Sequence, residues 1–227
     1  MGGIYANGRM SGVEIRNNKI HDIKCAVYGA NCIYLDDRSY HAIAEFNLCY
    51  NTNTDLINIK GSENIIRNNI LAFGKGGCIR RASVLTEGGR FVANVEKNIL
   101  VTMGNPIYRT GYFMDINASI WNSDLNLIWD YEQNELVCEQ QVPSPGKLRI
   151  TMEEWKKIRG NDRHSVIADP LFCDAENFDF TLDPGSPAFE LGFESFDLSD
   201  VGPRSPEVWR SILRASESKH PGRPVAD

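Results

Sequence analysis

Residues that could carry chemistry gather in segment 32–40, which reads Cys-Ile-Tyr-Leu-Asp-Asp-Arg-Ser-Tyr. If this segment is a strand with Ile33 and Leu35 on its inner face, alternation places Tyr34 and Asp36 together on its outer face. An aromatic ring can stack on a sugar, and a carboxylate beside a cationic group can exchange protons with a bound substrate. The segment therefore predicts a binding or acid–base site.

The same alternation extends this site to other segments. Pairs that begin with isoleucine start at residues 4, 33, 57, 79 and 107, which are 29, 24, 22 and 28 residues apart. If each isoleucine points inward, the residues beside it form one outer column on successive turns of the chain. The predicted column contains Tyr5, Tyr34, Asp36, Asn58, Lys60 and Arg80.

Each of these residues also has a structural interpretation. The Asp36-Asp37 pair could form a turn, and Lys60, which precedes Gly61, could be a solvated turn residue. The two tyrosines could simply pack between turns of the chain. Arg80 and Arg81 could pair with local acids, and His21 could be a structural member of an asparagine-rich turn.

Asparagines indicate the elements that must position the column. Asn18, Asn47, Asn69, Asn98 and Asn126 recur at spacings of 29, 22, 29 and 28 residues, each between two short β-rich runs. Asparagine suits such a turn because it tolerates the left-handed conformation, and stacked amides can form a ladder. A leucine-rich repeat is disfavoured because no LxxLxL pattern recurs, and a sandwich because regular hairpin turns are missing. We therefore predict an all-β protein, a right-handed parallel β-helix.

The repeat fades after residue 130, which predicts three segments. Residues 1–130 form the coils, 131–218 close the end of the β-helix, and 219–227 form a flexible tail. Within the closure we expect a polar loop at 131–150, a helix that starts with a capping box at Thr151–Glu154, and a terminal helix at 206–217. Since residue 4 is already in the strand register, the coils look N-terminally incomplete, and an uncapped first coil predicts self-association.

Composition excludes several classes of protein. The net charge of −6 and the pI near 5.3 argue against nucleic-acid binding, and no apolar run is long enough for a membrane helix. The chain shows no signal peptide. None of the six cysteines forms a CxxC motif, so we expect no metal and most cysteines buried as small hydrophobic residues.

The strings Gly-Gly-Ile-Tyr at 2–5, Val-Glu-Ile-Arg-Asn-Asn-Lys-Ile-His-Asp at 13–22 and Ile-Tyr-Leu-Asp-Asp at 33–37 resemble bacterial β-helix proteins near glycoside hydrolase family 141 and related pectate-lyase-like enzymes. Residues 162–172 and 184–188 are similar to the ending of those proteins. The resemblance implies a secreted or periplasmic full-length protein that acts on polysaccharides. It makes Asp36 or Asp37 one catalytic carboxylate, whereas the family's other carboxylate, which precedes the Gly-Ile-Tyr strand, has no counterpart here.

Three functions remain open. The first is part of a glycoside hydrolase that uses carboxylate acid–base catalysis on a polysaccharide or oligosaccharide, with no cofactor. The second is a lyase or epimerase acting on uronates, in which Lys60 or Arg80 assists and calcium is possible. The third is a non-catalytic glycan-binding or structural β-helix. The predicted substrate-binding residues are Tyr5, Tyr34, Asn58, Lys60, Arg80, Arg81 and His21.

Overall fold

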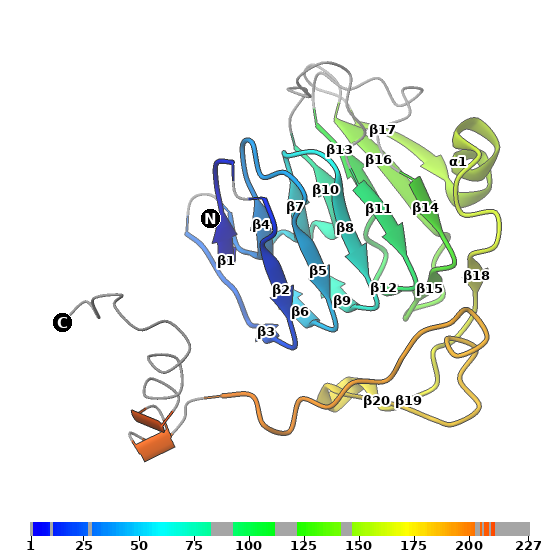
Figure 1. Cartoon of the computed structure of the whole chain (residues 1–227). Coiled ribbons are helices and arrows are strands. Elements are labelled where there is room, and N and C mark those ends of the chain that lie inside the picture. Colours follow the sequence, from blue (N-terminus) through cyan, green and yellow to red (C-terminus); the bar gives the residue numbers. More distant parts are fainter. Residues whose placement is uncertain are drawn as a thin grey trace. The chain divides into compact units, whose positions relative to one another are not determined.

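The computed structural model describes residues 2–9, 11–26, 29–82, 93–111, 122–141 and 147–202, together with residues 205, 207, 208, 210 and 211. The chain divides into two compact units, Met1–Asp197 and Leu198–Asp227. Every strand of the described residues belongs to the first unit, where short strands are stacked coil upon coil (Figure 1). Among the described residues, no helix is both long enough and apolar enough to span a membrane.

Sheet A is the sheet that carries the predicted column. Its parallel strands are β1 (Gly2–Ala6), β4 (Asn31–Leu35), β7 (Asp55–Ile59), β10 (Gly77–Arg81), β13 (Tyr108–Thr110) and β16 (Val137–Gln141). An antiparallel strand, β17 (Lys147–Thr151), pairs with β16 and ends the sheet.

Two further parallel sheets complete each coil. Sheet B contains β2 (Glu14–Arg16), β5 (Ile43–Glu45), β8 (Asn64–Arg67), β11 (Ala93–Glu96) and β14 (Asn122–Asp124). Sheet C contains β3 (Lys19–His21), β6 (Leu48–Thr52), β9 (Ile70–Gly74), β12 (Ile99–Thr102), β15 (Leu127–Asp130) and β18 (Val166–Ile167). Each strand pairs with the strand one coil away, so the chain folds as the predicted right-handed parallel β-helix.

Branched aliphatic side chains fill the interior because they fit a pleated surface that is buried on one face. The predicted inward stack is confirmed: Ile4 pairs with Ile33, Ile33 with Ile57, and Ile57 with Ile79. The next step is wrong by one residue, since Tyr108 and not Ile107 aligns with Ile79. A shift of one residue exchanges the two faces of a strand, so Arg109 takes the outer position beside Arg80.

The predicted asparagine ladder is also confirmed. The Nδ2 of each ladder asparagine donates to the Oδ1 of the next, from Asn18 through Asn47, Asn69 and Asn98 to Asn126, over 2.8–3.1 Å. The left-handed conformation falls on the residue before each ladder asparagine, as at Phe46 and Leu125, and not on the asparagine itself as the sequence analysis supposed. The turn therefore frees the asparagine side chain to bond within the stack.

The C-terminal end of the ladder meets a closing segment. The predicted capping box is present at Thr151 and Glu154 and starts α1 (Met152–Arg159). Beyond α1, the buried Asp162 accepts hydrogen bonds from Asn126 Nδ2 (3.4 Å), Trp155 Nε1 (3.2 Å) and Ser165 Oγ (2.8 Å). The last rung of the ladder thus donates to a carboxylate of the closing segment.

Two expectations for the C-terminal part need revision. The polar loop predicted at 131–150 is wrong, because β16 and β17 form a hairpin there, with Cys138 in the core and Ile150 packed against it. A second hairpin follows, β19 (Phe172–Asp174) and β20 (Asp179–Leu182), joined by the 3₁₀ helix η2 (Ala175–Asn177). In the helix predicted at 206–217, Glu207, Val208, Arg210 and Ser211 are described and helical; the rest of it and the tail 219–227 lie outside the described residues.

Four of the six cysteines are buried, as expected for small hydrophobic residues. They are Cys32, Cys49, Cys78 and Cys138, whereas Cys25 and Cys173 are exposed. Burial raises the pKa of the Cys78 thiol far above its ordinary range, which keeps that thiol protonated and unreactive.

Candidate functional site

A row of polar side chains crosses the outer face of sheet A, and we call it the outer row. Strand pairing aligns Tyr5 with Tyr34, Tyr34 with Asn58, and Asn58 with Arg80, as the sequence predicted. The row continues through Arg109 to Glu139, neither of which the sequence analysis had proposed. Each coil contributes one member because consecutive strands pair in register.

Asp36 directly follows β4 and is held by the coils on both sides, in an arrangement we call the Asp36 cluster. The Tyr5 hydroxyl of the preceding coil donates to Asp36 Oδ2 over 2.5 Å. Lys60 Nζ of the following coil lies 2.7 Å from Asp36 Oδ1 and 5.5 Å from the centroid of the Tyr34 ring. The rings of Tyr5 and Tyr34 meet edge to face, with centroids 5.4 Å apart. The structure therefore brings four of the predicted residues into contact.

The electrostatics of the Asp36 cluster favour the carboxylate form. Burial by itself would raise the pKa of Asp36, but hydrogen bonds from Lys60 and Tyr5 outweigh it and hold the pKa below its usual range. The hydrogen bond to Asp36 raises the pKa of Tyr5, so the phenol stays protonated at neutral pH. Asp36 is therefore suited to act as a base or nucleophile, and Tyr5 as a hydrogen-bond donor.

A close approach between coils fixes the position of this cluster. A Cβ on Gly61 would lie 1.7 Å from the backbone oxygen of Ser39, so only glycine permits the turn after Lys60 to pack there. Ser39 in turn donates from Oγ to the carbonyl oxygen of Ala6 over 3.0 Å, and the Asp36 amide donates to the same oxygen. These contacts fix the segments at Ala6, Ser39 and Gly61, on three successive coils, around the Asp36 carboxylate.

Asp37 is the other candidate carboxylate, and it is held less firmly. Its Oδ1 lies 3.8 Å from Lys60 Nζ, and its side chain is 55% exposed, compared with 12% for Asp36. The pair of acids thus consists of one fixed, partly buried group and one exposed neighbour.

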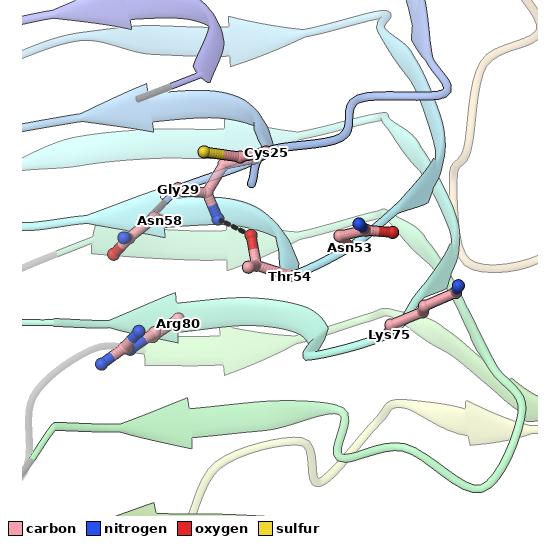
Figure 2. A pocket seen from close by; sticks show the side chains of 8 residues that line it. Cys25, Gly29, Asn53, Thr54, Asn58, Lys75 and Arg80 are labelled. Atoms are coloured by element: carbon pink, nitrogen blue, oxygen red, sulfur yellow. Dashed lines mark hydrogen bonds between the residues drawn. The ribbon is translucent and has the colours of Figure 1, made fainter. Parts of the chain in front are cut away.

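Beside the Asp36 cluster, the outer face of sheet A contains a pocket of about 480 Å³ (Figure 2). Asn58 and Arg80 of the outer row line it, and Lys75 lies at its other end. Asn31 orders one wall by donating from Nδ2 to Thr54 Oγ1 over 3.1 Å and to the Asp55 carbonyl over 2.6 Å. The full lining is Cys25, Gly29, Asn31, Asn53, Thr54, Asn58, Lys75 and Arg80.

An ion-pair network continues the face beyond the pocket. Arg109 Nη1 donates to both carboxylate oxygens of Asp55 over 2.9 and 3.0 Å, and Arg109 Nε donates to Glu139 Oε1 over 3.2 Å. Glu139 also accepts from Arg149 Nε over 3.0 Å. Burial raises the pKa of Asp55, and Arg109 and Arg80 oppose that rise. The network compensates two buried carboxylates on this face.

Two predicted site residues, Arg81 and His21, belong neither to the outer row nor to the side chains around Asp36. Arg81 is fully buried in the register of Leu35 and Ile59, and its Nη1 donates to the Gly61 carbonyl over 2.7 Å. Burial lowers the pKa of Arg81 to about 10. His21 lies on sheet C, where its ring stacks on Tyr50 with centroids 4.7 Å apart. Both residues are therefore placed away from the outer face of sheet A.

In the part of the chain that the structure describes, no group of three or more histidine, cysteine, aspartate or glutamate side chains is arranged to hold a metal ion. The chemistry that the described face offers is that of carboxylates, lysines, arginines, amides and phenols.

Comparison with known proteins agrees with this architecture. Residues 2–121 match the family described as right handed beta helix region. Over 210 residues the chain is 25% identical to the uncharacterized protein YwoF of Bacillus subtilis (strain 168). This alignment covers 82% of the chain but only 40% of that relative, so the chain spans less than half of the curated relative it matches. No solved structure matches the chain significantly.

Proposed function

Because this chain belongs to the right-handed β-helix family, we propose that the outer face of sheet A binds a saccharide and that the Asp36 cluster takes part in cleaving it. The observation that carries the proposal is the Asp36 carboxylate. It accepts a hydrogen bond from Tyr5 and pairs with Lys60, at the end of a row of polar and aromatic side chains. Tyr5, which is 48% exposed, offers a ring face to a sugar, whereas Tyr34 is 2% exposed and packs against Tyr5 and Lys60. The resemblance to glycoside hydrolase family 141 rests on the sequence motifs alone.

In this proposal Asp36 is the catalytic base or nucleophile. Hydrolysis of a glycosidic bond requires a carboxylate that activates water or attacks the sugar, and an acid that protonates the leaving oxygen. Asp36 stays ionised because Lys60 and Tyr5 lower its pKa, which suits the first role. Asp37, which is exposed and lies beside the Asp36 cluster, is the candidate for the acid that protonates the leaving oxygen.

Elimination or epimerisation at a uronate is the second candidate function. The observation that favours it is the ion pair between Lys60 and Asp36, because the reaction needs a cation beside the sugar carboxylate and a base near its α-proton. A lyase releases an unsaturated sugar that absorbs ultraviolet light, whereas a hydrolase releases a saturated reducing end.

The test compares wild type with the variants Asp36→Asn and Lys157→Gln on neutral and uronate-bearing polysaccharides. Lys157 is exposed on α1 and serves as a surface control. We expect Asp36→Asn to lower turnover by about 100-fold or more, with glycan binding retained within a few-fold and Lys157→Gln unchanged. Full turnover in Asp36→Asn would remove Asp36 from the mechanism, and no binding to any glycan would overturn the proposal.

A further inference from the structure

Arg81 is a charged residue at a core position of sheet A. It aligns with Ile59 on β7, which aligns with Leu35 on β4, and all three side chains are fully buried. Burial lowers the pKa of Arg81 to about 10, so the guanidinium is still charged at neutral pH. A hydrophobic side chain of similar volume often stabilises such a position as well or better, because it loses no hydration. Core packing alone therefore does not account for this arginine.

The hydrogen bonds of Arg81 are few for a buried guanidinium. Its Nη1 donates to the carbonyl oxygen of Gly61 over 2.7 Å. Its Nε and Nη2 are also buried, and neither has a hydrogen-bond partner among the described residues. Unsatisfied buried donors are costly, so an arrangement that served stability alone would pair them. The bond to Gly61 is thus the contact that separates Arg81 from an ordinary core residue.

The bond to Gly61 leads to the Asp36 cluster. Gly61 directly follows Lys60, whose Nζ lies 2.7 Å from Asp36 Oδ1. The Lys60 amide donates to the Leu35 carbonyl over 2.7 Å, which ties this turn to the preceding coil, and Arg81 ties it to the following one. The lysine stem is flexible, so the place of its ammonium depends on the backbone that carries it. We propose that Arg81 is a positioning residue, which anchors the Lys60–Gly61 turn from inside the β-helix and so holds the Lys60 ammonium against Asp36.

The charges around the cluster agree with this role. Asp36 faces the Tyr5 hydroxyl from β1 and the Lys60 ammonium from the coil that follows, and Asp37 is its neighbour in the chain. The charge of Asp37 also acts on Arg81, where it opposes the fall in pKa that burial causes. Arg81 therefore lies within electrostatic reach of this pair of acids, and its effect on Asp36 passes through the backbone at Lys60.

This inference rests on the proposed function only for the catalytic role of Asp36. The charge state of the carboxylate can be measured in the protein without a substrate. Lys60 helps to hold the pKa of Asp36 below its usual range, so a Lys60 ammonium that moves away lets that pKa rise. The pKa of Asp36 therefore reports where the ammonium lies.

The experiment follows the carboxyl carbon of Asp36 by NMR during a pH titration of wild type, Arg81→Met, Lys60→Met and the double variant. Methionine is similar in length to arginine and has neither its charge nor its N–H donors. We expect the pKa of Asp36 to rise in Arg81→Met and to rise further in Lys60→Met, where the cation is lost. In the double variant, Arg81→Met should add nothing to Lys60→Met, because Arg81 acts through Lys60.

Three further variants separate positioning from general loosening of the core. Arg81→Lys keeps a charge and N–H donors and should return the pKa of Asp36 toward its wild-type value. Ile79→Val removes a buried methylene from the core face of the same strand, so it should weaken the fold without moving that pKa. If Arg81→Met does not fold, Arg81→Gln is measured in its place, and its shorter side chain should raise the pKa as well. An unchanged pKa in the folded Arg81 variant, or an equal rise in Ile79→Val, would overturn the inference.

Turnover then tells the failure of this inference from the failure of the proposed function. With both correct, Arg81→Met should lower kcat about 10-fold and leave KM within a few-fold, because Arg81 positions a group and does not touch the substrate. Cleavage that depends on Asp36, with normal kcat and an unchanged Asp36 pKa in Arg81→Met, would overturn the positioning role alone. A raised Asp36 pKa in Arg81→Met, with full turnover in Asp36→Asn, would overturn the catalytic role of Asp36 and leave the positioning role standing.

Discussion

Replacement of Asn69 by alanine tests whether the asparagine ladder holds the coils together. The Asn69 side chain is fully buried and makes five hydrogen bonds. Its Nδ2 donates to the carbonyls of Ala44 (2.9 Å) and Arg67 (2.8 Å) and to Asn98 Oδ1 (2.9 Å). Its Oδ1 accepts from the amide (3.1 Å) and from Nδ2 (3.0 Å) of Asn47. Alanine would leave the Asn47 amide without this partner inside the protein.

The expected loss follows from these bonds. Each buried hydrogen bond contributes about 1 kcal/mol net, so the loss of five bonds in Asn69→Ala should lower the unfolding free energy by about 5 kcal/mol. Asn18 is the matched control, because it is half-buried at the first rung and its Nδ2 makes two bonds, to Arg16 O and Asn47 Oδ1. Asn18→Ala should lose about 1 kcal/mol.

The assay is urea unfolding followed by circular dichroism, with both variants compared at the same protein concentration. Equal losses at Asn69 and Asn18, or a loss below about 1 kcal/mol at Asn69, would refute the reasoning that burial makes the internal ladder bonds matter.

Three other predictions follow from the site and the sheet edges. Because its folded pKa is lowered, Asp36 contributes stability above the ordinary carboxyl pKa that is lost as pH falls through the folded value. Acid titration of unfolding free energy should therefore be flatter in Asp36→Asn, and an identical pH dependence in both proteins would contradict the ion pair with Lys60. Arg109→Met removes the cation that pairs with the buried carboxylates Asp55 and Glu139. We expect it to lower the free energy of unfolding in urea by about 3–5 kcal/mol. A change within about 0.5 kcal/mol would show that the network does not stabilise the fold. Since β1, β2 and β3 are edge strands of the three sheets, we propose self-association through the first coil; sedimentation should show a mass that rises with concentration, and a constant monomer mass would speak against it.

The isoleucine pairs predicted the register of four coils because alternation and coil length were both visible in the sequence. The prediction failed at Tyr108, where a coil of 29 residues between register partners had been read as 28. Tyrosine is common on either face of a strand, so the Ile107-Tyr108 pair gave no warning. Arg109 was missed for this reason, although an arginine one residue after an inward position was the available signal.

The closing hairpin was missed because its strands are polar on the outer face. Glu139, Gln140 and Arg149 give segment 131–150 the composition of a loop, yet Cys138 and Ile150 point toward the core. Local hydrophobicity does not predict such strands, because their charged side chains pair with residues that are distant in the sequence. The same limit applies to Arg81, whose burial depends on the Gly61 carbonyl and not on anything adjacent in the sequence.

The hydrogen bond by which Asp162 ends the ladder at Asn126 would allow the number of coils to vary. Every internal asparagine offers one amide to the next rung and accepts one from the rung before, so the chemistry at each step is the same. In the closing segment, Asp162 accepts a hydrogen bond from Asn126 Nδ2, and Ser165 Oγ accepts one from the backbone N–H of Asn126. Whole coils could therefore be duplicated or deleted during evolution without changes to the first rung or to the closing segment. The length of the outer row would then evolve independently of the closing segment.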